Sequence, residues 1–180
     1  AANVGINIGN ATNGWAFGPE KSERVLPHMS WIRFTVAAGT PEGYARIMYK
    51  GPEHTEVFDN AMENISHAIA YKKKHNLSVT IGIQMVLMPE FADEIIPFAQ
   101  LGLDLGVDYA VIKHCSDDET QSLGVDYSKY ESMYDLLETA EAMSTSETKI
   151  RHELLDDPDS IIFALKPAPT TICFSKYVVI

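Results

Sequence analysis

The sequence predicts an α/β fold built on a parallel sheet. Four short runs have the composition of strands: Val4–Gly9, Trp31–Ala37, Val79–Leu87 and Tyr109–Cys115. The segments between them have helical character, and strands that alternate with helices at this spacing form βαβ units.

The alternation of side chains along the strands predicts the type of sheet. In Trp31–Ala37, Phe34 lies on an apolar face and Arg33 on the opposite, polar one. Val4–Gly9 and Val79–Leu87 also have one apolar face and one small or polar face. Strands covered by helices on both faces have continuous apolar runs instead. We therefore expect helices on one side only and a polar lumen on the other. This describes a partial parallel (β/α) barrel of TIM-barrel type, incomplete at its N-terminal side.

The helices between the strands have recognisable ends. The segment 55–76 has apolar residues at three- and four-residue spacing and lysines in its last turn, where the helix dipole favours cations. The segments 89–106 and 127–143 are two further helices. Another can begin after Thr40, with Thr40 as the cap and Pro41 in the first turn.

The chain divides unevenly. Residues 1–148 are expected to form the partial barrel, and residues 149–180 a C-terminal tail of uncertain placement. The tail has a short amphipathic start, breakers at Pro167 and Pro169, and a strand-like end. The sequence also begins almost directly with a strand, so we expect the chain to be a piece of a larger protein.

The composition restricts the class of partner. The 14 basic and 25 acidic residues give a net charge of −11, which argues against nucleic acid or an anionic membrane surface as the main partner. A small anionic ligand remains compatible with local basic groups. No apolar run approaches the roughly 20 residues that cross a bilayer. The two cysteines, Cys115 and Cys173, are too few for a disulfide framework, and we expect a cytoplasmic protein.

Candidate site residues lie where the strands end, because parallel α/β folds bind ligands there. Asn13 offers a side-chain amide, although the pattern favours a simple turn as the explanation of Asn13–Gly14. Arg33 and Thr35 point into the expected lumen, as ligand contacts or as structural hydrogen-bonding groups. Gln84 shares a face with Gly82, which allows a close backbone approach or marks a bulge.

Lys113 and His114 end the last expected strand, just before Cys115. Lys113 and His114 point to opposite faces, and the pattern does not show which face lies inside. Since adjacent strand residues point apart, His114 with Cys115 is neither a metal site nor a nucleophilic pair. The sequence contains none of the motifs G-x-G-x-x-G, GxxxxGK[ST], G-x-S-x-G or HExxH.

Several segments, in order, resemble the radical S-adenosylmethionine (radical SAM) core over about residues 3–145. They are "TNG", "WIRFTVAAGTPEGYARIM", "FDNAMENI", "VTIGIQMVLMPEFADEIIPFA" and "GVDYAVIKHCS". The resemblance implies a partial (β/α)6 barrel in which a 4Fe–4S cluster reductively cleaves S-adenosylmethionine to start radical chemistry. By position, it implies that the cofactor contacts Asn13, Thr35, Gln84 and the backbone around Lys113 and His114. Arg33 completes the expected cofactor-binding set, and the catalytic residues stay unassigned.

Two departures bear on this resemblance. Ala37 stands where the family usually has Asp, and the CxxxCxxC cluster motif is absent, so the chain cannot supply three thiolate ligands. The chain is therefore expected to be an inactive fragment that binds no metal, with an unknown small-molecule or peptide substrate. One alternative is another (β/α)-barrel enzyme, aldolase- or isomerase-like, with Lys113 as a Schiff-base or acid/base group. A non-enzymatic binding piece is the other.

Overall fold

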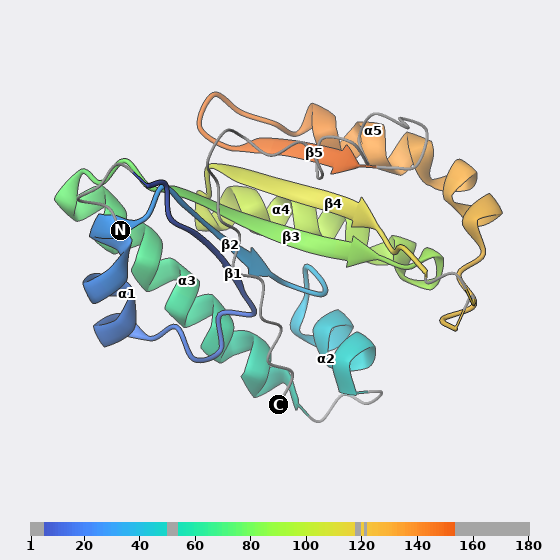
Figure 1. The fold of residues 1–180 in the computed structure, drawn as a ribbon. Coiled ribbons are helices and arrows are strands. Elements are labelled where there is room, and N and C mark those ends of the chain that lie inside the picture. Colours follow the sequence, from blue (N-terminus) through green and yellow to red (C-terminus); the bar gives the residue numbers. More distant parts are fainter. Residues whose placement is uncertain (1–5, 50–53, 118–119, 121, 154–180) are drawn as a thin grey trace.

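A computed structural model describes residues 6–49, 54–117, 120 and 122–153 of the chain. Five strands form one sheet in which every neighbouring pair is parallel and the spatial order follows the sequence (Figure 1). The strands are β1 (Gly9–Thr12), β2 (Trp31–Thr35), β3 (Thr80–Leu87), β4 (Tyr109–His114) and β5 (Lys149–Glu153).

Helices connect each strand to the next. Helices α3, α4 and α5, the last two preceded by short 3-10 helices, match the segments that the sequence predicts, and α2 begins after Thr40 as expected. Helix α3 ends at Asn76 and α4 at Gly106, both in the left-handed conformation with φ of 50° and 66°. The bounds are α1 (Pro19–Val25), η2 (Leu26–His28), α2 (Pro41–Tyr49), α3 (Thr55–His75), η4 (Pro89–Glu94), α4 (Ile95–Leu105), η5 (Tyr127–Met133) and α5 (Tyr134–Ala142).

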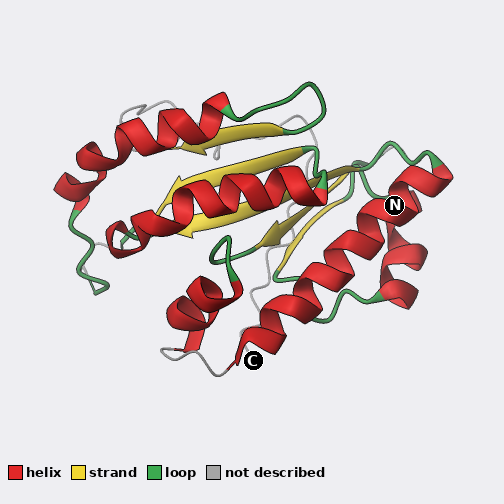
Figure 2. Cartoon of the chain, turned by 180° about the vertical axis from the view of Figure 1, so that it is seen from behind, coloured by secondary structure: helices red, strands yellow, loops and turns green. Residues whose placement is uncertain are grey.

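The helices cover a single face of the sheet. Figure 1 shows the sheet in front of α1, α3, α4 and α5, and Figure 2 shows the same helices in front of the sheet. Helix α2 lies beyond the end of β2 and packs against α3. Parallel strands in sequential order, joined by crossovers of one hand, place every helix on the same side, as in a barrel. The predicted α/β fold of partial-barrel type is thus confirmed, and the five described strands form an open sheet.

The hydrophobic core lies between the sheet and these helices. Alternate strand residues enter it, and they meet apolar side chains of α3, α4 and α5. Its largest fully buried side chains include Ile32, Phe34, Ile65, Ile83, Met85, Phe98, Ile112 and Leu137.

Two boundaries differ from those expected. Strand β1 begins at Gly9, whereas the sequence predicted a strand over Val4–Gly9, and residues 1–5 lie outside the described part. The sheet also continues through β5, beyond the expected barrel limit at residue 148. In β5 only Ile150 is buried, so its sequence KIRHE lacks a strand's usual apolar face. The rest of the expected tail, residues 154–180, lies outside the described residues.

None of the helices within the described residues combines the length and the apolar character that crossing a bilayer requires.

Candidate functional site

The strand residues that point away from the helices form what we call the open face of the sheet. In β2, Ile32 and Phe34 are fully buried against the helices, so Arg33 and Thr35 point to the open face. Strand pairing then aligns open-face residues in rows across the strands. The polar lumen side that the sequence predicted corresponds to this face.

The first row joins Arg33, Gly82, Tyr109 and Lys149 across four neighbouring strands. Gly82 has no side chain, and the Tyr109 ring occupies the space above it. A Cβ atom at Gly82 would overlap that ring. The pairing of β3 continues through Gly82 without interruption, so this glycine provides a close approach and not a bulge.

Arg33 is the least satisfied group of this row. Its Nε atom is buried and has no hydrogen-bond partner among the described residues. Burial is the main reason why the pKa of Tyr109 is raised, and the nearby positive charge of Arg33 acts in the opposite direction. A buried donor without an acceptor costs free energy, so Arg33 is suited to bind a ligand that brings an acceptor.

The next two rows supply further polar groups. Thr35, Gln84, Val111 and Arg151 form one row, and Gln84 is only 8% exposed. Beyond it, Lys113 Nζ lies 3.6 Å from Glu153 Oε2, and their side chains are 36% and 52% exposed. This pair is partly solvated and weakly held.

The charges of the open face are opposite in sign to those of the whole chain. Among its described strand residues, four are basic and one, Glu153, is acidic, whereas the chain carries a net charge of −11. The four basic residues are Arg33, Lys113, Lys149 and Arg151. Such a local excess of positive charge attracts anions despite the acidic composition.

Lys113 and His114 lie on opposite faces of β4, which settles the question that the sequence left open. Lys113 belongs to the open face, and His114 is buried on the helix side, 5% exposed. His114 Nδ1 donates to the Glu153 carbonyl at 2.9 Å, and His114 Nε2 lies 3.2 Å from Ser116 Oγ. His114 therefore holds β4 and β5 together at their carboxyl ends, away from the open face.

Cys115 is also enclosed. Its backbone N–H donates to the Tyr130 hydroxyl, and that hydroxyl donates to the Leu87 carbonyl at 2.6 Å. Burial raises the pKa of the Cys115 thiol and raises that of Tyr130 to about 12. A thiol whose pKa is raised is a poor nucleophile near neutral pH. Cys173 lies outside the described residues.

Asn13 and Thr40 have local roles. The Trp15 N–H donates to Asn13 Oδ1 at 3.2 Å, which is the turn contact of an exposed Asn. The Gly43 N–H donates to Thr40 Oγ1 at 3.0 Å, so Thr40 caps α2 as the sequence predicted.

Glu94 is a buried carboxylate that the sequence did not single out. It is 5% exposed and accepts hydrogen bonds from the N–H groups of Gly39 and Thr40, at 3.0 and 3.2 Å. The Thr40 hydroxyl donates to Glu94 Oε1 as well, at 3.0 Å. Glu94 thereby fixes the loop between β2 and α2 to the segment that follows β3. All its contacts are internal, so its role is structural.

Comparisons with known proteins identify no family for this chain. No protein-family model and no curated protein matches the sequence. Two similar solved structures are a crystal structure of oxaloacetate acetylhydrolase (13% identity, TM-score 0.44) and oxaloacetate acetylhydrolase with the inhibitor 3,3-difluorooxalacetate (12%, 0.41). Each alignment covers 91% of this chain and 59% of the solved chain. At these values the similarity assigns no activity to the chain.

These findings contradict the radical SAM interpretation. The two similar solved structures are described as oxaloacetate acetylhydrolase, and the described residues contain no group of three or more His, Cys, Asp or Glu that could hold a metal ion. The assignment to that family was wrong, and so were its S-adenosylmethionine and 4Fe–4S cofactors. A turn after a strand, polar inward residues and a capped helix start are general features of parallel barrels, so their order did not identify a family.

The structure thus brings Arg33, Thr35, Gln84 and Lys113 to one face and places Asn13 and His114 elsewhere. The sequence did not single out Tyr109, which shares the parity of Lys113 along β4. It also gave no reason to select Arg151 and Glu153, because β5 was not predicted as a strand.

Proposed function

We propose that the open face binds a small anionic molecule and that the chain is part of a (β/α)-barrel enzyme acting on it. The buried Arg33 Nε atom without a partner carries this proposal. A guanidinium group binds a carboxylate or phosphate through two parallel hydrogen bonds, and such a ligand would supply the missing acceptor.

Neighbouring groups support the same ligand class. Gln84 and Tyr109 flank Arg33 with neutral hydrogen-bonding groups, and Arg151 and Lys113 extend the positive charge toward the carboxyl ends of the strands. The partner in this proposal is a small molecule, whether substrate or cofactor. The acidic composition again argues against nucleic acid and anionic membrane surfaces.

A binding titration with chemically graded probes tests the proposal. Succinate, phosphoenolpyruvate and a neutral diamide of similar size would be titrated into the full chain by calorimetry. We expect the anions to bind. Arg33→Gln should weaken their binding at least about tenfold, because it removes one or two charge-assisted hydrogen bonds. Arg33→Lys should restore little, because an ammonium group lacks the planar fork.

Arg46→Gln is the matched control. Arg46 is an exposed arginine on α2 whose guanidinium already bonds Asp93 at 2.8 Å, so its loss should leave anion binding unchanged. Equal binding of the anions and the diamide, or equal loss in both arginine variants, would refute the open-face site.

A second candidate role concerns Lys113 as a catalytic amine. Its place on the open face favours this role, but its ammonium group is partly solvated and paired with Glu153, unlike the desolvated amine that Schiff-base chemistry requires. Treatment of the chain with a small oxo acid and borohydride, followed by mass spectrometry, distinguishes a Schiff-base lysine from a lysine that only binds or transfers a proton. A covalent adduct on Lys113 would identify a Schiff-base enzyme, and its absence together with anion binding would leave Lys113 as a binding or proton-transferring group.

A further inference from the structure

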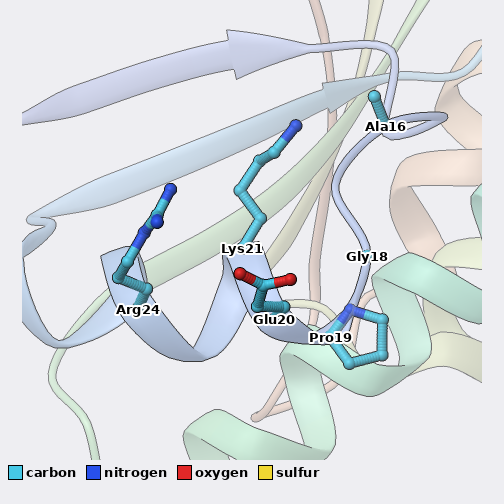
Figure 3. A pocket seen from close by; sticks show the side chains of 6 residues that line it. All are labelled: Ala16, Gly18, Pro19, Glu20, Lys21 and Arg24. Carbon is cyan, nitrogen blue, oxygen red and sulfur yellow. The ribbon is translucent and has the colours of Figure 1, made fainter.

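Two adjoining open cavities lie on the helix side, the first against α1 and the loop before it, and the second between α1 and the edge strand β1. Their volumes are about 260 and 240 Å³, and both are lined by Ala16 and Lys21. The first is also lined by Gly18, Pro19, Glu20 and Arg24 (Figure 3). The second is lined by Asn10, Thr12, Phe17, Val25 and Met29 as well. Together they have the size of a small-molecule site, roughly 300–1,000 Å³.

The first cavity is positively charged. Lys21 and Arg24 are three residues apart on α1 and therefore share one face of the helix. Figure 3 shows both side chains extending from the same side of α1. Within the described part of the chain, neither forms an ion pair or a side-chain hydrogen bond. Glu20 is the single acidic residue of the lining, so the cavity keeps an excess of positive charge.

The second cavity is mainly apolar, with two polar groups from β1. Phe17, Val25 and Met29 provide the apolar wall. Thr12 Oγ1 accepts a hydrogen bond from the Gly14 N–H at 3.3 Å, which leaves the Thr12 hydroxyl hydrogen to donate elsewhere. A molecule spanning both cavities would meet cations at one end and an apolar wall at the other.

The polar residues of β1 stand beside apolar residues of β2. Asn10 pairs in register with Ile32, and Thr12 pairs with Phe34. Ile32 and Phe34 are fully buried in the core, whereas Asn10 is exposed and Thr12 is partly exposed. Core packing therefore gives way to a polar opening at this edge of the sheet.

We propose that these cavities form a second binding site, for a small molecule with a carboxylate or phosphate head on a short apolar body. The head is held by Lys21 and Arg24, and the body packs against Phe17, Val25 and Met29. This site shares no residue with the open face and lies on the other side of the sheet, so it is independent of the function proposed above.

The test uses nuclear magnetic resonance titrations of the full chain. The probes are phenyl phosphate, 3-phenylpropionate, the neutral 3-phenylpropanamide and inorganic phosphate. We expect phenyl phosphate and 3-phenylpropionate to bind and to shift the backbone N–H signals of β1 and α1. 3-Phenylpropanamide lacks the anionic head and inorganic phosphate lacks the apolar body, so each should bind at least about fivefold more weakly. The tighter of the two anions identifies the head group.

The double variant Lys21→Gln/Arg24→Gln should weaken binding of the tighter anion about fivefold to tenfold, because it removes two partly exposed charge pairs. Lys73→Gln/Lys74→Gln on α3 is the control, since it removes the same charge from exposed positions outside both cavities. Unchanged affinity in the Lys21/Arg24 variant would overturn the proposal. So would shifts confined to the open face, equal loss in both double variants, or tight binding of inorganic phosphate alone.

Discussion

The two faces of the same sheet are built on opposite principles, although single strands contribute to both. On the helix side, Phe34 is fully buried and packs edge-to-face against Phe17, with ring centroids 5.5 Å apart. On the open face, its neighbours Arg33 and Thr35 are only partly buried or exposed. Buried charge differs in the same way: Glu94, in the segment that leads into α4, is hydrogen-bonded by backbone and side-chain donors, whereas the Nε atom of Arg33 has no partner within the described residues. The carboxylate of Glu94 is thus satisfied by groups of the protein itself, whereas Arg33 on the open face is suited to bind an acceptor from outside.

The largest effect expected from this difference is on Phe34. Phe34→Ala should lower the free energy of unfolding by about 3–5 kcal/mol, because it removes a fully buried ring and leaves a cavity. Thr35→Ala, one residue further along the strand, should change it by no more than about 0.5 kcal/mol. Urea denaturation measures both. Similar losses at the two positions would break the distinction between the faces.

Removal of the buried charge on the helix side should have the next largest effect. Glu94→Gln replaces a carboxylate that accepts hydrogen bonds from three donor groups, and we expect a loss of about 2–3 kcal/mol. Asp93→Asn is the control, because its exposed pair with Arg46 contributes about 0.2–1 kcal/mol. Amide hydrogen exchange at Gly39 and Thr40 should accelerate only in the Glu94 variant. Unchanged exchange there would show that Glu94 does not hold the loop.

A smaller effect is expected on the open face at Gly82. Gly82→Ala should cost about 1–3 kcal/mol, because the added methyl group meets the Tyr109 ring. In a Tyr109→Ala background the same substitution should cost much less. This double-mutant cycle, followed by chemical denaturation, measures the contact directly. Equal costs in both backgrounds would mean that the strand, and not the ring, requires glycine.

The smallest expected effect comes from Tyr130 on the helix side, whose contribution to stability changes with pH only in alkaline solution. Its pKa is about 12 in the folded protein against an ordinary value of 10.0, mainly because of burial. The folded state therefore holds a proton that the unfolded chain releases. The resulting stability is fully present below pH 10.0 and is lost as the pH rises through about 12.

Denaturation at successive alkaline pH values checks this. Tyr130→Phe should be less stable than the native chain near neutral pH, because it loses the hydroxyl contacts with Cys115 and Leu87. The difference between the two proteins should shrink between pH 10.0 and about 12. A constant difference over that interval would mean that burial does not raise the pKa of Tyr130.

The sequence by itself determined most of the fold and part of the candidate site. The alternation in β2 and β3 predicted a sheet with helices on one face, because each strand residue points opposite to its neighbour. It placed Arg33, Thr35 and Gln84 on the polar side for the same reason. The lysines in the last turn of α3, Gly106 after α4 and the cap at Thr40 marked helix ends through local backbone chemistry.

Only the tertiary structure decided the rest, because it depends on contacts between distant segments. The orientation of β4, with Lys113 on the open face and His114 against the helices, follows from packing on both sides, since both sets of side chains are about equally apolar. Strand β5 forms because β4 offers it a free edge, although its own sequence carries little apolar pattern. The bonds of Glu94 span 54 and 55 residues of sequence, and the unpaired state of Arg33 Nε depends on every neighbour at once.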